Sequence, residues 1–472
     1  MPHYDMIVIG SGPSGQRAAV QAAKLGKAVA ICERRELVGG VCVNTGTIPS
    51  KTFREGALYL SGFIQRGIYG QSYVVKENIT MSDLVSRCNM VIEREVDIIR
   101  HQMQRNQVVV IDGMARFLSD QELEITSENS RIQITADNIV IAVGTESAHP
   151  TEAHIDGKKV VTADEVLDMP ELPRTMTVVG GGVVGMEYAS IFAALGVEVT
   201  IVDARKGLLE FLDGEMVDSL IYHMRDMDCV FRLGERVGRV DSYGQGRVVA
   251  TLDSGKRVIS EALLYSVGRV GATGDLNLPA AGLDADERGR ISVNERYRTA
   301  QPHIYAVGDV IGFPSLASTS MEQGRIAACN AFGVSYTSER SLFPYGIYSV
   351  PEIAMVGQTE ETLTENRVPY EIGVARYREI ARGAIMGATQ GMLKILFDRE
   401  SRKVLGVHII GHSASELIHI GQSVLAFGGS LDYFVNTVFN YPTLAEAYKV
   451  AALDGYNKVG PEDSEAPLPY WS

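Results

Sequence analysis

Long hydrophobic runs and paired cysteines are missing from this sequence. No stretch of about 18 apolar residues occurs, so we expect no membrane-spanning helix. The start, MPHYDMIVIGSG, leaves no room for a secretory leader. The five cysteines, Cys32, Cys42, Cys88, Cys229 and Cys329, are odd in number and scattered, without a C-x-x-C pair. These features exclude a disulfide framework and favour a reducing cytoplasm.

Positive charge is also in deficit. Lys and Arg total 44 against 58 Asp and Glu, which gives a net charge of -14. Nucleic acids and anionic membranes attract proteins through Lys and Arg, so neither is an expected partner. The 472 residues, 45% of them hydrophobic, and the 48 glycines indicate two to four folded domains rich in tight turns. Small-molecule chemistry is therefore the better expectation.

The chain contains an internal repeat. VIGSGPSGQRAAVQAAKLGKAVAICE (8–33) aligns without a gap on VVGGGVVGMEYASIFAALGVEVTIVD (178–203). Each copy reads as an apolar strand, a glycine turn, a helix and a second strand that ends in a carboxylate. This is the dinucleotide-binding fingerprint in its full context, in which the glycines let the backbone approach a pyrophosphate and the terminal acid binds ribose hydroxyls. One such motif is a weak signal, but two copies predict two bound dinucleotides.

The remaining segments complete a three-part organisation. ADNIVIAVGTES (136–147) and HIYAVGDVIG (303–312) read as buried strands of the first unit, and segments such as VLGVHIIG beyond residue 342 read as a separate α+β domain. The predicted fold is α/β, with two Rossmann-like domains and a C-terminal α+β domain. The predicted ranges are 1–150 and 271–341 for the first nucleotide-binding domain, 151–270 for the second and 342–472 for the C-terminal domain.

A family resemblance rests on an ordered set of motifs. The order GSGPSG, GGVCVNTGTIPSK, IAVGT, VVGGGVVGMEYAS, SVGR, YAVGDVIG and FNYPTLAEAYK resembles the class I flavoprotein pyridine nucleotide-disulfide reductase superfamily over nearly the whole chain. GTIPSK in place of GCxPSK, SLASTSMEQGRIAA and GIYSVPE are similar to its transhydrogenase members. The resemblance implies FAD on the first repeat, NAD(H) and NADP(H) on the second, and a homodimer through the C-terminal domain.

The resemblance also assigns binding residues, by position in the motifs. Those implied for FAD are Gly10, Gly12, Gly15, Glu33, Gly40, Thr145 and Asp309. Those implied for the nicotinamide nucleotide are Gly180, Gly182, Gly185, Asp203, Arg205 and Gly268. Asp309 corresponds to the aspartate that binds the flavin ribityl chain, although an acid at this place could also cap a turn. Asp203 favours NAD, whereas the neighbouring cations could accept a 2′-phosphate or belong to a surface salt-bridge cluster.

Lys51 and Glu187 are candidate catalytic residues. Lys51 resembles the lysine beside flavin N5, and Glu187 resembles its carboxylate partner. A cation there stabilises reduced flavin, and a buried lysine needs a countercharge. An ordinary exposed lysine and a glutamate at a helix start are the alternatives.

Two departures from the family pattern affect the sulfur chemistry. Disulfide reductases carry a second cysteine where this chain has Thr47, which can form neither a disulfide nor a thiolate. They also place His-Pro before a C-terminal glutamate, in an arm that reaches the partner's flavin. Here Tyr441 precedes Pro442, with Glu446 retained, and a phenol is a poor proton donor to a thiol at neutral pH. Cys42 is either a remnant thiol near the flavin or a packing residue.

The expected activity is hydride exchange between NADPH and NADH pools through FAD, with ping-pong kinetics. An NAD(P)H diaphorase, quinone reductase or oxidase is the alternative, and a dihydrolipoamide dehydrogenase-like enzyme is disfavoured by Thr47 and Tyr441. A nucleotide-binding sensor without turnover is a hypothesis of another class. We expect no metal site, because His408, His412 and His419 lack a completing ligand pattern.

Overall fold

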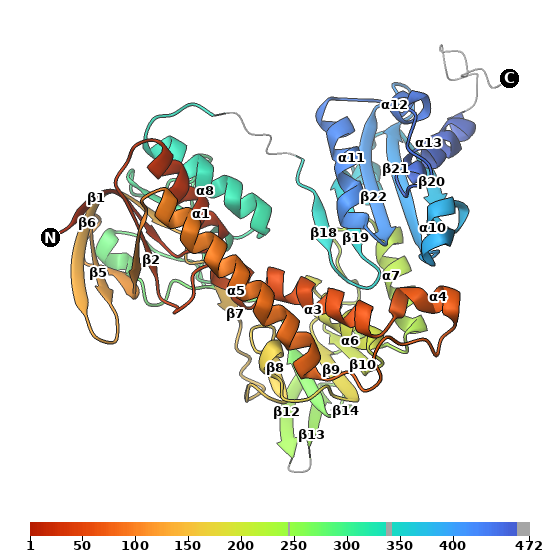
Figure 1. The fold of residues 1–472 in the computed structure, drawn as a ribbon, viewed down its shortest axis with the longest axis horizontal. Coiled ribbons are helices and arrows are strands. Elements are labelled where there is room, and N and C mark those ends of the chain that lie inside the picture. The colour runs from red at the N-terminus through yellow and green to blue at the C-terminus, as the bar shows by residue number, and fades with distance from the viewer. Residues whose placement is uncertain (244–245, 337–341, 460–472) are drawn as a thin grey trace.

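The first repeat forms the centre of the N-terminal part (Figure 1). The computed structural model describes residues 1–243, 246–336 and 342–459. Five strands run parallel in the order β3-β2-β1-β6-β17. They are β1 (His3–Ile9), β2 (Val29–Glu33), β3 (Val109–Asp112), β6 (Arg131–Ile141) and β17 (Ile304–Ala306). Two further strands, β4 (Met114–Phe117) and β5 (Glu122–Thr126), continue from the start of β6 as an antiparallel meander. Helices α1 (Pro13–Lys24) and α8 (Ala317–Ala331) pack on each other against the parallel strands.

The second repeat builds another parallel sheet, in the order β11-β10-β9-β15-β8. Its strands are β8 (Val160–Thr162), β9 (Thr175–Val179), β10 (Glu198–Asp203), β11 (Val230–Leu233) and β15 (Ala262–Tyr265). An antiparallel sheet of β12 (Val237–Tyr243), β13 (Arg247–Leu252) and β14 (Arg257–Ser260) lies beside it. A two-stranded ribbon of β7 (Thr145–Ser147) and β16 (Arg269–Gly271) joins the two nucleotide-binding units.

Helix α6 (Val183–Ala194) lies at the centre of the molecule. Every residue from Gly185 to Ala194 is buried, which explains why this segment is apolar almost all round. Helix α3 (Thr47–Leu60) packs on it, with the Phe53 and Phe192 rings 5.8 Å apart. On its other side α3 contacts α5 (Met81–Arg105), which starts at a capping box between Thr80 and Asp83.

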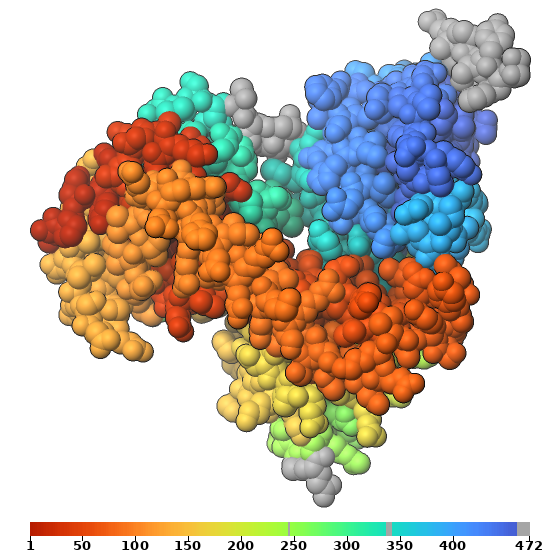
Figure 2. Space-filling view, in the orientation of Figure 1, coloured from red at the N-terminus to blue at the C-terminus, as the bar shows by residue number. Residues whose placement is uncertain are grey.

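The C-terminal part is a five-stranded antiparallel sheet in the order β18-β19-β22-β21-β20. Its strands are β18 (Tyr345–Ile347), β19 (Ile353–Gly357), β20 (Tyr370–Arg376), β21 (Gly391–Asp398) and β22 (Val404–Gly411). Helices α11 (Ala414–Ala426), α12 (Leu431–Asn436) and α13 (Glu446–Val459) pack on the sheet. Figure 2 shows this part resting on the segment that carries α3, and both belong to one hydrophobic core that includes Phe53, Val350 and Met355.

The predicted fold class is confirmed: two parallel α/β units are followed by an α+β unit. The three main sheets fall within the predicted ranges, but the boundaries themselves stay predictions, and residues 460–472 of the last range lie outside the described part. Within the described ranges, no helix has both the length and the apolar character needed to cross a membrane.

Candidate functional site: two nucleotide pockets and a lysine–glutamate pair

The first pocket opens where the parallel strands of the first unit end. It brings together the first glycine turn, the end of β2, the Gly40–Cys42 turn, Thr145 and Asp309. Eight of the predicted residues line it: Gly10, Gly12, Glu33, Gly40, Cys42, Thr47, Thr145 and Asp309. Gly15 does not line the pocket, because it packs against the turn itself. The sequence motifs thus converge on one cavity at the carboxyl edge of the sheet, the usual place for a dinucleotide.

The glycine turn leaves room for a bulky phosphate ligand. Gly10 has φ +103°, and a Cβ there would lie 2.4 Å from the carbonyl oxygen of Ala142. A Cβ at Gly15 would come within 1.9 Å of the Gly10 carbonyl oxygen, so only glycine lets α1 approach the strand. At Gly12, by contrast, a Cβ would meet no atom within 4 Å, because this position faces the open pocket. The backbone at the start of α1 is therefore accessible to a pyrophosphate, and the residues present fit FAD.

The two acids of this pocket are held in different ways. Glu33 accepts hydrogen bonds from the Ser11 hydroxyl at 2.5 Å and the Ser11 N–H at 3.0 Å, which fixes one carboxylate oxygen against the glycine turn. Burial raises the pKa of Asp309, and Arg269, Ser320 and Thr145 oppose that rise. Asp309 follows β17 and begins a short 3-10 turn, so the turn-capping alternative and a ligand role are both compatible with its place.

Cys42 and Thr47 lie together at the edge of the same pocket. Cys42 belongs to the short helix α2 (Gly40–Asn44), and Thr47 is the first residue of α3. Burial raises the pKa of the Cys42 thiol, while a hydrogen bond with Thr47 and the charge of Lys51 partly offset this. All five cysteines are free. Disulfide reductases carry a second thiol at the position of Thr47. Here the Thr47 hydroxyl is hydrogen-bonded to the Cys42 thiol.

Lys51 and Glu187 form the contact that the sequence predicted. Lys51 lies one turn into α3, and its Nζ is 2.6 Å from Oε2 of Glu187 on α6. Only 5% of the Glu187 side chain is exposed, so an unpaired charge there would be costly. The alternative of an exposed lysine and a helix-start glutamate is therefore wrong. The catalytic role of the pair stays a prediction.

The second pocket lies at the equivalent edge of the second parallel sheet. Gly180, Gly182, Asp203, Arg205 and Gly268 line it, as the sequence predicted. Gly185 does not, because a Cβ there would lie 1.9 Å from the carbonyl oxygen of Gly180, the same close approach as in the first repeat. The two repeats are thus equivalent in three dimensions as well as in sequence.

Arg205 forms an ion pair with Asp203, the acid that is predicted to bind ribose. Its Nε and Nη2 lie 3.0 and 2.7 Å from the two oxygens of Asp203, and the Gly181 N–H donates to the same carboxylate at 2.6 Å. Burial would raise the pKa of Asp203, but these hydrogen bonds hold it below its ordinary value. The Arg205 side chain is 51% exposed, whereas that of Asp203 is 5% exposed.

Lys51 and Glu187 line neither pocket, and the two remaining predicted catalytic residues also lie outside both. Tyr441 is 67% exposed, and Glu446 begins α13. Oε2 of Glu446 is buried without a hydrogen-bond partner among the described residues. Neither side chain contacts the first pocket of its own chain. Their assignment to a partner subunit's flavin stays a prediction.

Sequence reasoning missed a link between the two pockets. Arg269 lines the second pocket and donates from Nε to the Thr145 hydroxyl of the first at 2.9 Å. It also contacts Asp164 at 3.3 Å, which accepts a hydrogen bond from Thr45 at 3.2 Å. The available signal was the SVGR motif, in which Arg269 directly follows the predicted Gly268.

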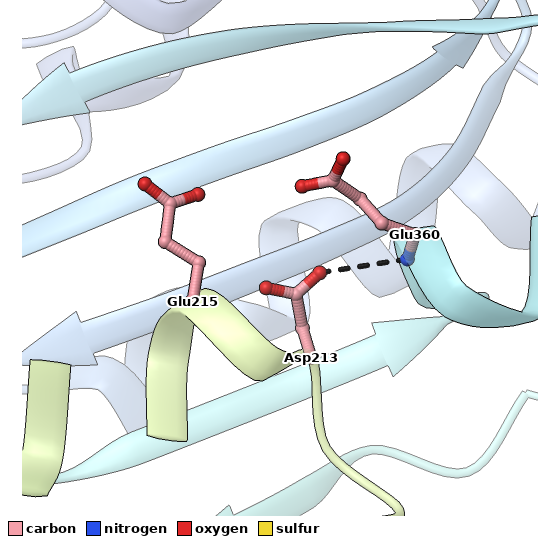
Figure 3. Close-up of side chains that lie close together, drawn as sticks. All are labelled: Asp213, Glu215 and Glu360. Atoms are coloured by element: carbon pink, nitrogen blue, oxygen red, sulfur yellow. Dashed lines mark hydrogen bonds between the residues drawn. The ribbon is translucent and has the colours of Figure 1, made fainter. Parts of the chain in front are cut away.

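A cluster of acids lies apart from the pockets. Figure 3 shows the carboxylates of Asp213, Glu215 and Glu360 directed towards a common space, close enough to hold a metal ion. That space receives the ammonium group of Lys394, 2.8 Å from Asp213 and 3.0 Å from Glu215, and also bonded to Glu360. The neighbouring His408 is fully buried, with Nε2 2.9 Å from the Gln358 carbonyl oxygen. The ammonium of Lys394 therefore occupies the space between the three carboxylates and offsets part of their charge.

Comparison with known proteins defines the class. Residues 4–324 match the family model described as pyridine nucleotide-disulphide oxidoreductase, and residues 343–452 match the dimerisation domain of the same family. The chain therefore belongs to the pyridine nucleotide-disulphide oxidoreductase family.

The chain is also similar to individual members of this family. Proteins named soluble pyridine nucleotide transhydrogenase are 53% identical in Mycobacterium bovis, covering 97% of this chain and 98% of the relative, and 43% identical in Shigella flexneri, covering 97% and 100%. Among solved structures, the HOCl-induced flavoprotein disulfide reductase RclA of Escherichia coli superposes with a TM-score of 0.87 at 28% identity, over 96% of this chain and 99% of the other. LpdA of Mycobacterium tuberculosis gives 0.87 at 25% identity, with the same coverage.

Proposed function

We propose that this protein is an FAD-dependent soluble pyridine nucleotide transhydrogenase, which transfers hydride between NADPH/NADP+ and NADH/NAD+. One observation carries the proposal: both nucleotide pockets are formed, while Thr47 stands beside Cys42 where a disulfide reductase needs a thiol. Dithiol chemistry is impossible at such a turn. The names of relatives up to 53% identical over 97% of the chain support the same activity.

FAD, when bound, supplies the two-electron store between the two nucleotides. Gly10 and Gly12 bring the turn backbone to its pyrophosphate, Glu33 and Asp309 offer carboxylates to its hydroxyls, and Lys51 supplies a positive charge held in place by Glu187. Thr47 accepts no electrons. The second pocket receives one nicotinamide nucleotide, releases it and then receives the other, so ping-pong kinetics are expected.

Exchange between the two pools requires one pocket to accept both nucleotides. Asp203 can accept hydrogen bonds from the ribose of NAD(H), once the Arg205 guanidinium has left it. For NADP(H), Arg205 can turn to the 2′-phosphate and compensate the nearby carboxylate. The exposed, ion-paired position of Arg205 supports both arrangements without any change in the backbone.

The C-terminal unit matches a dimerisation domain, which supports a homodimer as the working assembly. In that assembly Tyr441 and Glu446 would reach the partner's first pocket. A cytoplasmic location remains the expectation from the five free thiols.

The decisive experiment supplies NADPH and thio-NAD+ to the FAD-loaded protein without oxygen and follows reduction of the analogue by its absorbance. Lipoamide, glutathione disulfide, a quinone and oxygen serve as competing acceptors. Rapid reduction of thio-NAD+ without disulfide turnover is the expected result. Fast quinone or oxygen reduction with negligible thio-NAD+ reduction would instead identify a flavin reductase with another acceptor.

A further inference from the structure

The GIYSVPE motif (346–352) is one of the segments on which the family resemblance rests. In the structure it contacts the two helices that carry Lys51 and Glu187. It connects β18 to β19 in the C-terminal unit and passes along α6. The Tyr348 N–H donates to Oε1 of Glu187 at 2.8 Å, and the Val350 N–H donates to the Ser190 hydroxyl at 3.0 Å. Glu187 and Ser190 are three residues apart and so lie on one face of α6. The segment is thereby fixed to the helix that carries the acidic member of the catalytic pair.

The same segment is fixed to α3. Arg54 donates from Nε to the Ser349 carbonyl oxygen at 3.1 Å, and its Nη2 lies 3.2 Å from Glu352. Lys51, three residues before Arg54 on the same helix face, places its Nζ 5.0 Å from the centre of the Tyr348 ring. This is cation–π distance. Residues 348–352 of the C-terminal unit therefore contact both members of the pair and one further residue of each helix.

Tyr348 is the one residue of this segment that contacts both Lys51 and Glu187. Its backbone N–H holds one oxygen of Glu187, which leaves the other oxygen directed at Lys51. Its ring face attracts the Lys51 ammonium and so restricts the positions that the flexible lysine side chain can adopt. This cation–π attraction is stronger because the contact is partly shielded from water. Burial raises the pKa of the Tyr348 phenol, so the ring stays neutral and its face stays available to a cation.

We propose that Tyr348 is a positioning residue, whose ring and backbone N–H hold the ammonium of Lys51 and the carboxylate of Glu187 in the arrangement that serves the flavin. The proposal rests on the proposed function, because it takes the first pocket to hold FAD. The ring lies against Lys51, while the phenol hydroxyl hydrogen-bonds to Ser415. The aromatic face is therefore the required feature, and phenylalanine can replace tyrosine.

The test compares Tyr348→Phe, which keeps the ring, with Tyr348→Leu, which removes it at similar hydrophobicity. Tyr348→Met is the second ring-less variant, in case leucine does not fold. Tyr243→Leu, on β12 and outside both pockets, is the matched control for loss of an aromatic residue. FAD content and the midpoint of thermal unfolding are measured for each, followed by the midpoint potential of the bound flavin and the rate of its anaerobic reduction by NADPH.

We expect the ring-less variants to retain FAD, to reduce it about tenfold more slowly and to show a more negative flavin midpoint potential, since a displaced cation stabilises reduced flavin less. Tyr348→Phe and Tyr243→Leu should match the wild type. An unchanged potential in the ring-less variants, or equal defects in the phenylalanine and leucine variants, would overturn the proposal. If the potential shifts as expected but the wild type fails to reduce thio-NAD+, the role of Tyr348 stands and the transhydrogenase assignment fails.

Discussion

The Lys51 ammonium lies 2.6 Å from Oε2 of Glu187, and this ion pair joins the helix after the Cys42 turn to the central helix of the second nucleotide-binding unit. Lys51 ends the GGVCVNTGTIPSK motif, and Glu187 lies in the VVGGGVVGMEYAS motif. The two residues are 136 positions apart in the chain. The contact therefore ties α3, which begins at Thr47, to α6, which begins after the second glycine turn.

Lys51→Met is expected to slow anaerobic flavin reduction by about a hundredfold, because it removes the positive charge that the proposed function places beside the flavin. FAD content should remain, since no lining contact of the first pocket is removed. Stopped-flow absorbance after mixing with NADPH measures the rate. Lys76→Met, which removes an exposed ion pair with Asp83, is the control and should leave the rate unchanged. Wild-type kinetics in Lys51→Met would contradict the assigned role.

Thr47→Cys is expected to give no turnover of lipoamide or glutathione disulfide. The substitution restores a thiol beside Cys42, but the proton donor of the disulfide reductases is still absent because Tyr441 replaces it. Adding Tyr441→His should produce measurable disulfide turnover in the assembled protein. A single Thr47→Cys variant that turns over disulfides as fast as the double variant would show that the C-terminal arm does not supply the proton.

The sequence predicted the features that depend on local pattern. Both repeats fold as strand, glycine turn, helix and strand, because the spacing of Gly10, Gly12 and Gly15 has the same steric consequence as that of Gly180, Gly182 and Gly185. These patterns lie within about 30 residues of chain, where periodicity and turn chemistry are informative.

Contacts between distant segments could not be read in the same way. Arg269 meets Thr145 across 124 positions, and Lys394 meets Asp213 across 181. Lys394 even stands in an apolar strand, MLKILFD, where the alternation alone gives no reason for a charge. Its reason is the carboxylates of another unit, and only the packing of the units reveals them.

Arg205→Leu is expected to raise KM for NADPH about tenfold while changing KM for NADH less than about threefold. Only NADPH carries the 2′-phosphate, so only NADPH loses a charge-assisted contact. In the wild type burial would raise the pKa of Asp203, but the hydrogen bonds from the Arg205 side chain and from backbone N–H groups hold that pKa below its ordinary value. In the variant the backbone N–H groups of Gly181 and residue 205 remain to donate to the carboxylate. Steady-state kinetics with each nucleotide measure the effect, with Arg232→Leu on β11 as the control. Equal changes for NADPH and NADH would indicate that Arg205 serves the fold rather than nucleotide choice.

Lys394→Met is expected to lower the free energy of unfolding by about 3–5 kcal/mol, because it leaves the buried carboxylate of Asp213 without its countercharge. Neither the Lys394 nor the Asp213 side chain is exposed to solvent. Adding Asp213→Asn and Glu360→Gln, which neutralise two of the acids, should recover part of the loss. The control is Lys458→Met, which removes a half-exposed pair with Asp454 and should cost at most about 1 kcal/mol.

The effect of Lys394 should also depend on pH in a defined direction. Burial would lower the pKa of Lys394, but the hydrogen bonds that its ammonium donates to Asp213 and Glu360 raise it above the ordinary value. Above about pH 10.4 the unfolded chain loses this proton while the folded protein keeps it, so unfolding becomes easier as pH rises. The Lys394 contribution is therefore complete at neutral pH and declines in alkali. Urea denaturation followed by circular dichroism, from neutral pH to about pH 11, should show the wild type converging on Lys394→Met, and a constant difference would contradict the buried ion pairs as its source.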